Sequence, residues 1–161
     1  MRHLRTLFFV FIVTYGVYGF ANDADRDESG IIVSEGEIDA FAMRVGDCFD
    51  DSPELTDASI EVQDVAGLPC SEPHDNEVYA MFDVSLDAFP GDESMFDLST
   101  DACLKRFKSF VGKSYDESIL DLFAIYPTAE SWSQVNDREV ICAVYRVDYK
   151  KMTGSSKSSG I

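Results

Sequence analysis

The chain has 161 residues and a formal net charge of −17, from 30 acidic and 13 basic side chains. The acidic side chains are concentrated toward the N-terminus: residues 22–101 hold 23 of them against two arginines, whereas residues 102–161 hold seven against nine basic ones. Nucleic acid and anionic membranes attract clustered lysine and arginine, so this composition argues against both as ligands. The negative charge favours solubility and the binding of a cation or a basic partner. The length of the chain suits one domain.

The first 21 residues have the pattern of a secretory signal peptide. Arg2 and Arg5 precede an apolar run from Leu7 to Phe20, and small residues stand three and one before an expected cut after Ala21. The apolar run has 14 residues, whereas a helix needs about 20 to cross the hydrocarbon core. We therefore expect a secreted or periplasmic protein without stable membrane insertion after cleavage. The alternative is an uncleaved N-terminal helix that anchors the chain.

Two polar segments flank the expected domain. Residues 22–40 carry seven acidic side chains and one short apolar group at 31–33, which predicts an acidic flexible spacer. Residues 151–161 hold five serines or threonines and two glycines, with no aromatic residue, which predicts a flexible Gly/Ser tail. The folded domain is expected between them, at residues 41–150.

Short apolar stretches within this domain predict strands, and one longer segment predicts a helix. The expected strands are 41–49, 60–65, 78–84, 120–125 and 140–147. The main helix is expected at 94–111, because Ser94 and Asp97 approximate a capping box and Gly112 supplies a left-handed stop. One helical turn is expected at 129–135. This order of elements predicts an α+β fold: an antiparallel sheet of about five strands with one main helix packed on it.

Four cysteines follow the leader, where thiols are readily oxidised, so two disulfides and no free thiol are expected. Four cysteines allow three pairings. Cys103 lies at helical spacing with Phe107, and Cys142 alternates with valines on one face of a strand. A helix packed on a sheet would therefore bring Cys103 to Cys142 and leave Cys48 with Cys70. The second pair closes a loop of about 22 residues, which stabilises the fold by roughly 3 kcal/mol.

The segment after Cys70 contains the one histidine that follows the leader, His74, beside the carboxylates of Glu72, Asp75 and Glu77. An imidazole among carboxylates suits a proton relay or a mixed nitrogen and oxygen metal site. A zinc site usually needs three or four His or Cys ligands, and the cysteines here are assigned to disulfides. No metal and no cofactor are therefore expected. A metal site, acid–base chemistry and a structural role for His74 all stay open as interpretations.

Trp132 and Arg138 form a second candidate group, just before the last expected strand. Tryptophan and arginine are enriched where surfaces bind partners. The structural alternative is that Trp132 covers the core while Asp137 and Arg138 fix the turn into the strand.

Several segments carry a family resemblance. They are Val45–Phe49, Val65–Ala80, Phe89–Gly91, Cys103 with Phe107 and Val111–Gly112, Pro127–Trp132, and Asp137–Cys142. With these residues and spacings, the chain resembles the septum formation domain family over about residues 41–161. It departs from the family pattern in carrying Asn136 where members tend to carry glycine.

The resemblance implies an exported or membrane-tethered, mostly actinobacterial domain with a link to cell division, and no enzymatic activity comes with it. The positions that it points to are Glu72, Pro73, His74 and Glu77, with Trp132 and Arg138. We therefore expect a secreted or periplasmic, disulfide-stabilised, non-enzymatic interaction domain that binds an envelope protein or a cell-wall component. The alternative is a metal-dependent or His-dependent hydrolase that uses Glu72, His74, Asp75 and Glu77.

Overall fold

The computed structural model of the chain describes residues 23–51 and 64–161. The expected signal peptide lies outside the described residues, as does most of the strand expected at 60–65. Within the described part, no helix combines the length and the apolar composition needed to cross a bilayer.

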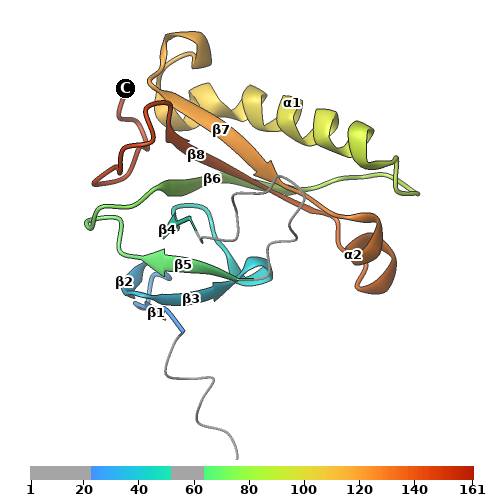
Figure 1. Cartoon of the computed structure of the whole chain (residues 1–161), viewed down its shortest axis with the longest axis horizontal. Coiled ribbons are helices and arrows are strands. Elements are labelled where there is room, and N and C mark those ends of the chain that lie inside the picture. The colour runs from blue at the N-terminus through green and yellow to red at the C-terminus, as the bar shows by residue number, and fades with distance from the viewer. Residues whose placement is uncertain (1–22, 52–63) are drawn as a thin grey trace, which may run out of the picture.

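A six-stranded antiparallel sheet forms the centre of the fold, with the strand order β3-β5-β4-β6-β8-β7 (Figure 1). Its strands are β3 (Gly36–Asp39), β4 (Cys48–Asp50), β5 (Asp64–Leu68), β6 (Asn76–Asp83), β7 (Leu120–Ile125) and β8 (Glu139–Arg146). A separate two-stranded sheet pairs β1 (Asp25–Arg26) with β2 (Ile32–Ser34). The predicted α+β class is confirmed, and β3 adds a sixth strand at one edge.

One long helix, α1 (Asp92–Val111), lies along one face of the sheet and contacts β6 and β7 (Figure 1). It ends as predicted at Gly112, whose φ is +86° and whose N–H donates to the carbonyl of Lys108. The predicted cap at Ser94 is wrong, because the helix begins two residues earlier, after Gly91. The short helix α2 (Ala129–Gln134) follows β7, where one turn was expected.

The main core lies between α1 and the sheet. Cys103 and Phe107 of α1 are buried there with Val140, Cys142 and Val144 of β8. The residues between these three on β8 face the other side of the sheet, where they join a second core under β2 to β5. Alternation along a strand thus supplies apolar side chains to both faces.

The two disulfides are those predicted. Cys48 is bonded to Cys70 and Cys103 to Cys142, and the described residues contain no free cysteine. The first links β4 to the loop before β6, and the second fastens α1 to β8.

A register shift in β6 was not predicted. It lies between Val78 and Ala80. Two neighbouring residues, Tyr79 and Ala80, therefore both pack against the main core, whereas Val78 packs in the second core. The ring of Tyr79 lies 6.1 Å from that of Phe107 and 5.8 Å from that of Phe110. The bulge therefore gives the helix face one more large aromatic side chain than strict alternation would allow.

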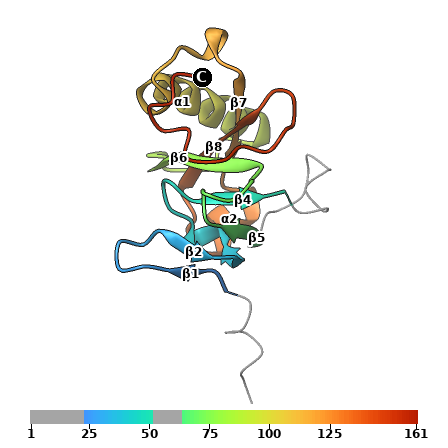
Figure 2. The same cartoon turned by 90° about the vertical axis from the view of Figure 1, so that its left-hand side faces the viewer.

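The acidic segment before residue 41 is folded, so the prediction of a flexible spacer at 22–40 is wrong. Its described residues form β1, β2 and β3. Strand β3 is the edge strand of the six-stranded sheet, and the β1–β2 pair packs beside β5 (Figures 1 and 2). Ile32 and Ile38 are buried in the second core, while Glu37 and Asp39 beside Ile38 are exposed. Arg26 also forms a two-point ion pair with the buried carboxylate of Asp47, at 2.6 and 2.7 Å. On β3, the two acidic side chains thus lie on the solvent side of the strand and the isoleucine on the core side.

The C-terminal segment also belongs to the fold, so the prediction of a flexible tail at 151–161 is wrong. Met152 is buried in the main core and Ser156 is buried beside it. The backbone N–H and C=O of Met152 pair with those of His74 at 2.7 and 3.0 Å. Further along, the N–H of Gly160 donates to the carbonyl of Val111, which places the chain end beside the end of α1 (Figure 2).

Candidate functional site

His74 and Glu77 are fully buried at the start of β6, whereas Glu72 is exposed and Asp75 is half-buried. The Nδ1 atom of His74 lies 2.8 Å from the carbonyl oxygen of Glu72. A carbonyl only accepts hydrogen bonds, so Nδ1 carries the proton in this contact. The other ring nitrogen, Nε2, is buried and has no hydrogen-bond partner among the described residues.

The carboxylate of Glu77 holds the C-terminal segment. One oxygen accepts a hydrogen bond from the Ser155 hydroxyl, and the other accepts one from the Ser156 backbone N–H at 2.6 Å. Hydrogen bonds to an ionised carboxylate are about twice as strong as neutral ones. Glu77 and His74 therefore lie behind the C-terminal segment, out of contact with solvent.

Asp75 serves a different contact. Its carboxylate lies 3.0 Å from the Lys151 ammonium, which also contacts Asp50 at 2.5 Å. The predicted group of Glu72, His74, Asp75 and Glu77 is therefore divided. Only His74 and Glu77 come together, and they do so against the Cys48 sulfur, with one ligand-type atom of each residue within 4.8 Å of the others.

Trp132 and Arg138 are brought together, as the structural interpretation requires. The Arg138 guanidinium lies 3.4 Å from the centre of the Trp132 ring, and its Nη1 donates to the carbonyls of Trp132 and Asp137. Cation–π contacts of this kind favour arginine over lysine. The pair closes the turn between α2 and β8.

Side-chain hydrogen bonds fix the start of α2 and the turn that follows it. Thr128 and Ser131 form a capping box at the start of α2, and the Ser131 hydroxyl also donates to the Asp137 carboxylate at 2.9 Å. Asn136 has a φ of +57°, a left-handed conformation that suits glycine and is tolerated by asparagine. The backbone at this position therefore accepts either glycine or asparagine.

The two candidate groups are far apart. Along the antiparallel β6–β8 ladder, Asn76 pairs with Tyr145 at one end and Asp83 pairs with Glu139 at the other. Seven residues of strand span roughly 20 Å. His74 precedes one end and Arg138 precedes the other, so they cannot belong to a single small-molecule site.

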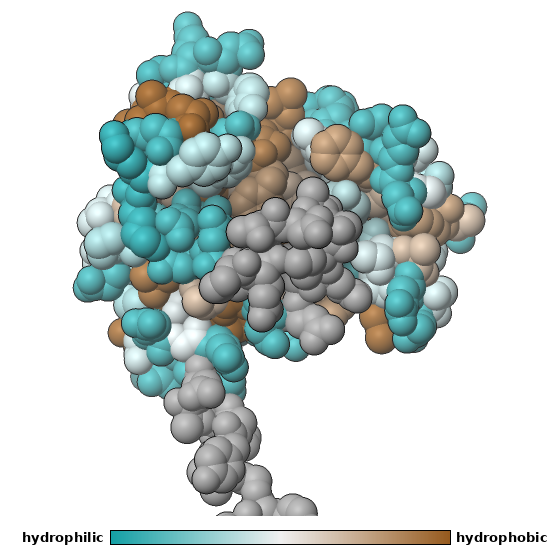
Figure 3. Space-filling view, viewed as in Figure 1, coloured by the Kyte–Doolittle hydropathy of each residue, from teal (hydrophilic) through white to brown (hydrophobic). Residues whose placement is uncertain are grey.

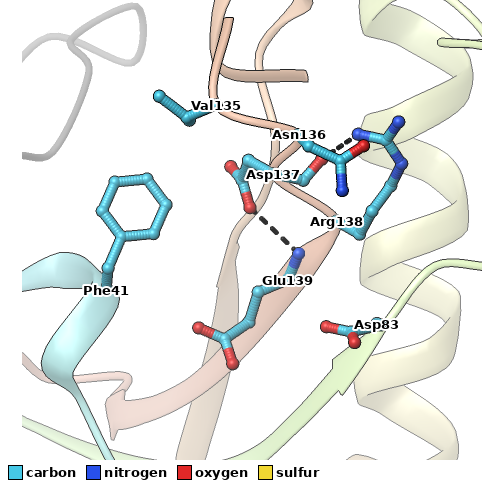
Figure 4. A pocket seen from close by; sticks show the side chains of 7 residues that line it. All are labelled: Phe41, Asp83, Val135, Asn136, Asp137, Arg138 and Glu139. Atoms are coloured by element: carbon cyan, nitrogen blue, oxygen red, sulfur yellow. Dashed lines mark hydrogen bonds between the residues drawn. The ribbon is translucent and has the colours of Figure 1, made fainter. Parts of the chain in front are cut away.

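An open pocket of about 460 Å³ lies at the Arg138 end of this ladder (Figure 4). Its lining residues are Phe41, Asp83, Val135, Asn136, Asp137, Arg138 and Glu139. Phe41 forms one side and the 135–139 segment forms the other. Phe41 and Val135 are 63% and 64% exposed, although both are large and apolar. On the face shown in Figure 3, several hydrophobic patches lie among hydrophilic residues.

The pocket is acidic. Asp83, Asp137 and Glu139 supply carboxylates, and none of the three forms an ion pair within the described residues. Burial, followed by repulsion from the Asp83 and Asp137 carboxylates, raises the pKa of Glu139. Arg138 also lines the pocket, but its guanidinium is stacked on Trp132 and forms no ion pair with these carboxylates.

The sequence did not reveal this pocket. Phe41 lies in a 3-10 turn (Ala40–Ala42) about 95 residues before Val135, and only the pairing of β6 with β8 sets Asp83 opposite Glu139. Arg138 was the one lining residue among the predicted positions. Phe41 carried no distinguishing signal, because it stands within the apolar residues 40–43 at the start of an expected strand.

A family model described as "Septum formation" matches residues 45–159. The chain belongs to the septum formation family. The match includes the Cys48–Cys70 disulfide, the His74 and Glu77 group, the Trp132–Arg138 turn and most of the C-terminal segment. Phe41 and the β1 to β3 strands lie before it. Comparison with curated proteins gave no match, and comparison with solved structures gave none either.

Proposed function

We propose that this member of the septum formation family is an extracytoplasmic, non-enzymatic interaction domain of the cell envelope that acts in cell division. Its partner is a protein segment that presents basic side chains next to an apolar one, and it binds at the acidic pocket between Phe41 and the α2–β8 turn. The family supplies the link to septum formation.

The pocket is the observation that carries the proposal. Two large apolar side chains are exposed beside three carboxylates that have no cationic partner in the described residues. A partner with lysine or arginine would relieve the repulsion among these carboxylates, and an apolar side chain would cover Phe41 and Val135. The strongly acidic first half of the chain would accelerate the encounter with such a partner.

The extracytoplasmic location is supported by the two disulfides, since disulfides persist in oxidising compartments and are rare in the cytosol. The leader-like first 21 residues point the same way.

The hydrolase alternative has no comparable support. His74 and Glu77 have no exposed surface, and both oxygens of Glu77 already accept hydrogen bonds from the C-terminal segment. A catalytic base must reach the proton that it abstracts, within about 3 Å or through one water. The arrangement favours a structural use of both side chains in the oxidised protein.

A peptide titration followed by nuclear magnetic resonance tests the proposal. The probe is a short acetylated and amidated peptide of alternating lysine and leucine, and amide shifts are expected at the pocket and not at α1. The double variant Phe41→Ser with Val135→Ser should weaken binding by about tenfold, which is roughly 1.4 kcal/mol.

The matched control is Phe96→Ser. Phe96 is also an exposed aromatic residue, 52% exposed on α1, and its loss should leave the affinity unchanged. Shifts spread evenly over the acidic surface, or equal weakening by both variants, would contradict a defined site.

A further inference from the structure

The buried group around the Cys48–Cys70 disulfide contains a second set of potential ligands. Cys48, His74 and Glu77 are each 0% exposed. The Cys48 sulfur, a His74 ring nitrogen and a Glu77 carboxylate oxygen lie within 4.8 Å of one another. Cys70, bonded to Cys48, brings a second sulfur to the same place.

His74 is oriented as metal-binding histidines are. Its Nδ1 donates to the carbonyl of Glu72 at 2.8 Å, which leaves the lone pair on Nε2. That atom is buried and has no partner among the described residues. Histidine ligands commonly donate one ring N–H to a backbone carbonyl and coordinate the metal through the other nitrogen. An orphaned buried nitrogen is otherwise costly.

Glu77 is supported in the same manner. The Ser155 hydroxyl and the Ser156 backbone N–H orient its carboxylate, and no lysine or arginine pairs with it in the described residues. A buried carboxylate without a cation beside it is unfavourable unless hydrogen bonds or a metal compensate its charge.

We propose that reduction of the Cys48–Cys70 disulfide converts this group into a Zn²⁺ site with Cys48, Cys70, His74 and Glu77 as ligands. Two thiolates, one imidazole and one carboxylate form a four-coordinate set of the types that zinc binds. Tetrahedral coordination with bonds of about 2.0–2.3 Å needs ligand atoms about 3.3–3.8 Å apart, so the buried atoms close by roughly 1 Å around the ion. The site is closed and structural, with no open position for a substrate.

The reaction balances in two steps. A dithiol gives two electrons and two protons to the sulfur–sulfur bond and becomes a disulfide, which leaves two thiols on the chain. A phosphine gives the same two electrons and becomes a phosphine oxide, and one water molecule supplies the oxygen of the oxide and the two thiol protons. Zinc then binds and displaces the two thiol protons. Disulfide and zinc are alternative states of the same sulfurs, so the oxidised protein does not bind zinc here.

Cobalt titration of untagged full-length chain tests the proposal, because thiolate bonded to Co²⁺ gives a near-ultraviolet charge-transfer band. The chain reduced with a phosphine should bind one Co²⁺ with this band, and Zn²⁺ should displace it. The oxidised chain should give no band. His74→Gln should weaken cobalt binding at least tenfold.

The second disulfide provides the matched control, because reduction frees its thiols too. Cys103→Ser with Cys142→Ser should retain the band, whereas Cys48→Ser with Cys70→Ser should lose it. Near-ultraviolet circular dichroism follows folding in the same samples. If reduction partly unfolds the chain, recovery of the native signal on adding cobalt also supports the site. No stoichiometric band in the reduced chain, or a band that survives without Cys48 and Cys70, would overturn the proposal.

Discussion

Met152 offers the sharpest test of the finding that the C-terminal segment is part of the domain. Its side chain is 6% exposed and packs in the main core, while only its backbone pairs with His74. Met152→Ala therefore removes the core contacts and the contact at 3.5 Å from the Ser156 hydroxyl to the Met152 sulfur, and leaves the backbone hydrogen bonds to His74 intact. Truncation of a buried methionine to alanine costs 2–5 kcal/mol in general, and a site near the surface that can partly collapse belongs at the lower end, about 2–3 kcal/mol.

Denaturant unfolding under non-reducing conditions measures this difference, with the slope checked for two-state behaviour. The neighbouring residue Thr153 is exposed, so Thr153→Ala is the matched control and should change stability by less than about 0.5 kcal/mol. A flexible tail would give two equal and near-zero effects. Met152→Ala within about 0.5 kcal/mol of the wild type would refute the packing of this segment.

Three further results are expected. The double variant Cys103→Ala with Cys142→Ala opens a loop whose ends are 39 residues apart. The gain in loop entropy of the unfolded chain should lower the free energy of unfolding by about 4 kcal/mol. An unchanged denaturation midpoint would contradict the role of this disulfide. Arg138→Gln should destabilise the domain by about 1–2 kcal/mol and shift the fluorescence emission of the single tryptophan, Trp132, to the red as its ring is uncovered. A full loss of stability with unchanged emission would contradict the stacking. Burial and two neighbouring aspartates raise the pKa of Glu139, so the folded state binds this proton more tightly than the unfolded state. The ionised side chain therefore destabilises the folded protein as the pH rises above the pKa of the unfolded state. Glu139→Gln should raise the melting temperature at pH 7 and lose this advantage below about pH 4. The same gain at both pH values would contradict the assignment.

The fold was largely predictable from local patterns. Apolar alternation in 140–147 and the stop at Gly112 are local signals, and both are found in the structure. The disulfide pairing followed from the helix-on-sheet packing of Cys103 and Cys142. These features depend on short-range periodicity, which a sequence displays directly.

The terminal segments were misread because composition was taken as a measure of order. Ile38 stands between two acids, and the acids face solvent from a strand, so a high charge does not imply disorder when every second side chain is exposed. In the C-terminal segment one methionine supplies the apolar anchor, and serine donors satisfy Glu77. A segment with few apolar residues can therefore be held in the fold when a buried carboxylate accepts its hydrogen bonds.

The candidate site was predictable only in part. His74 and Glu77 are three residues apart and their proximity was expected. The C-terminal segment that contacts them, through the Met152 backbone at His74 and through Ser155 and Ser156 at Glu77, is distant in sequence. The acidic pocket depends on the register of β6 against β8 and on the position of Phe41. The pairing register of two strands distant in sequence cannot be predicted from either short segment alone, so the sequence did not predict this surface.

The proposal that the pocket binds a basic and apolar partner is tested most directly by site-specific photo-crosslinking in the cells that make the protein. A photoreactive residue replaces Phe41 in one strain and Phe96, the exposed control on α1, in another. We expect one discrete adduct from position 41, none from position 96, and loss of the adduct when Asp83→Lys reverses the charge of the pocket. No adduct from position 41, or the same adducts from both positions, would contradict a defined interaction site.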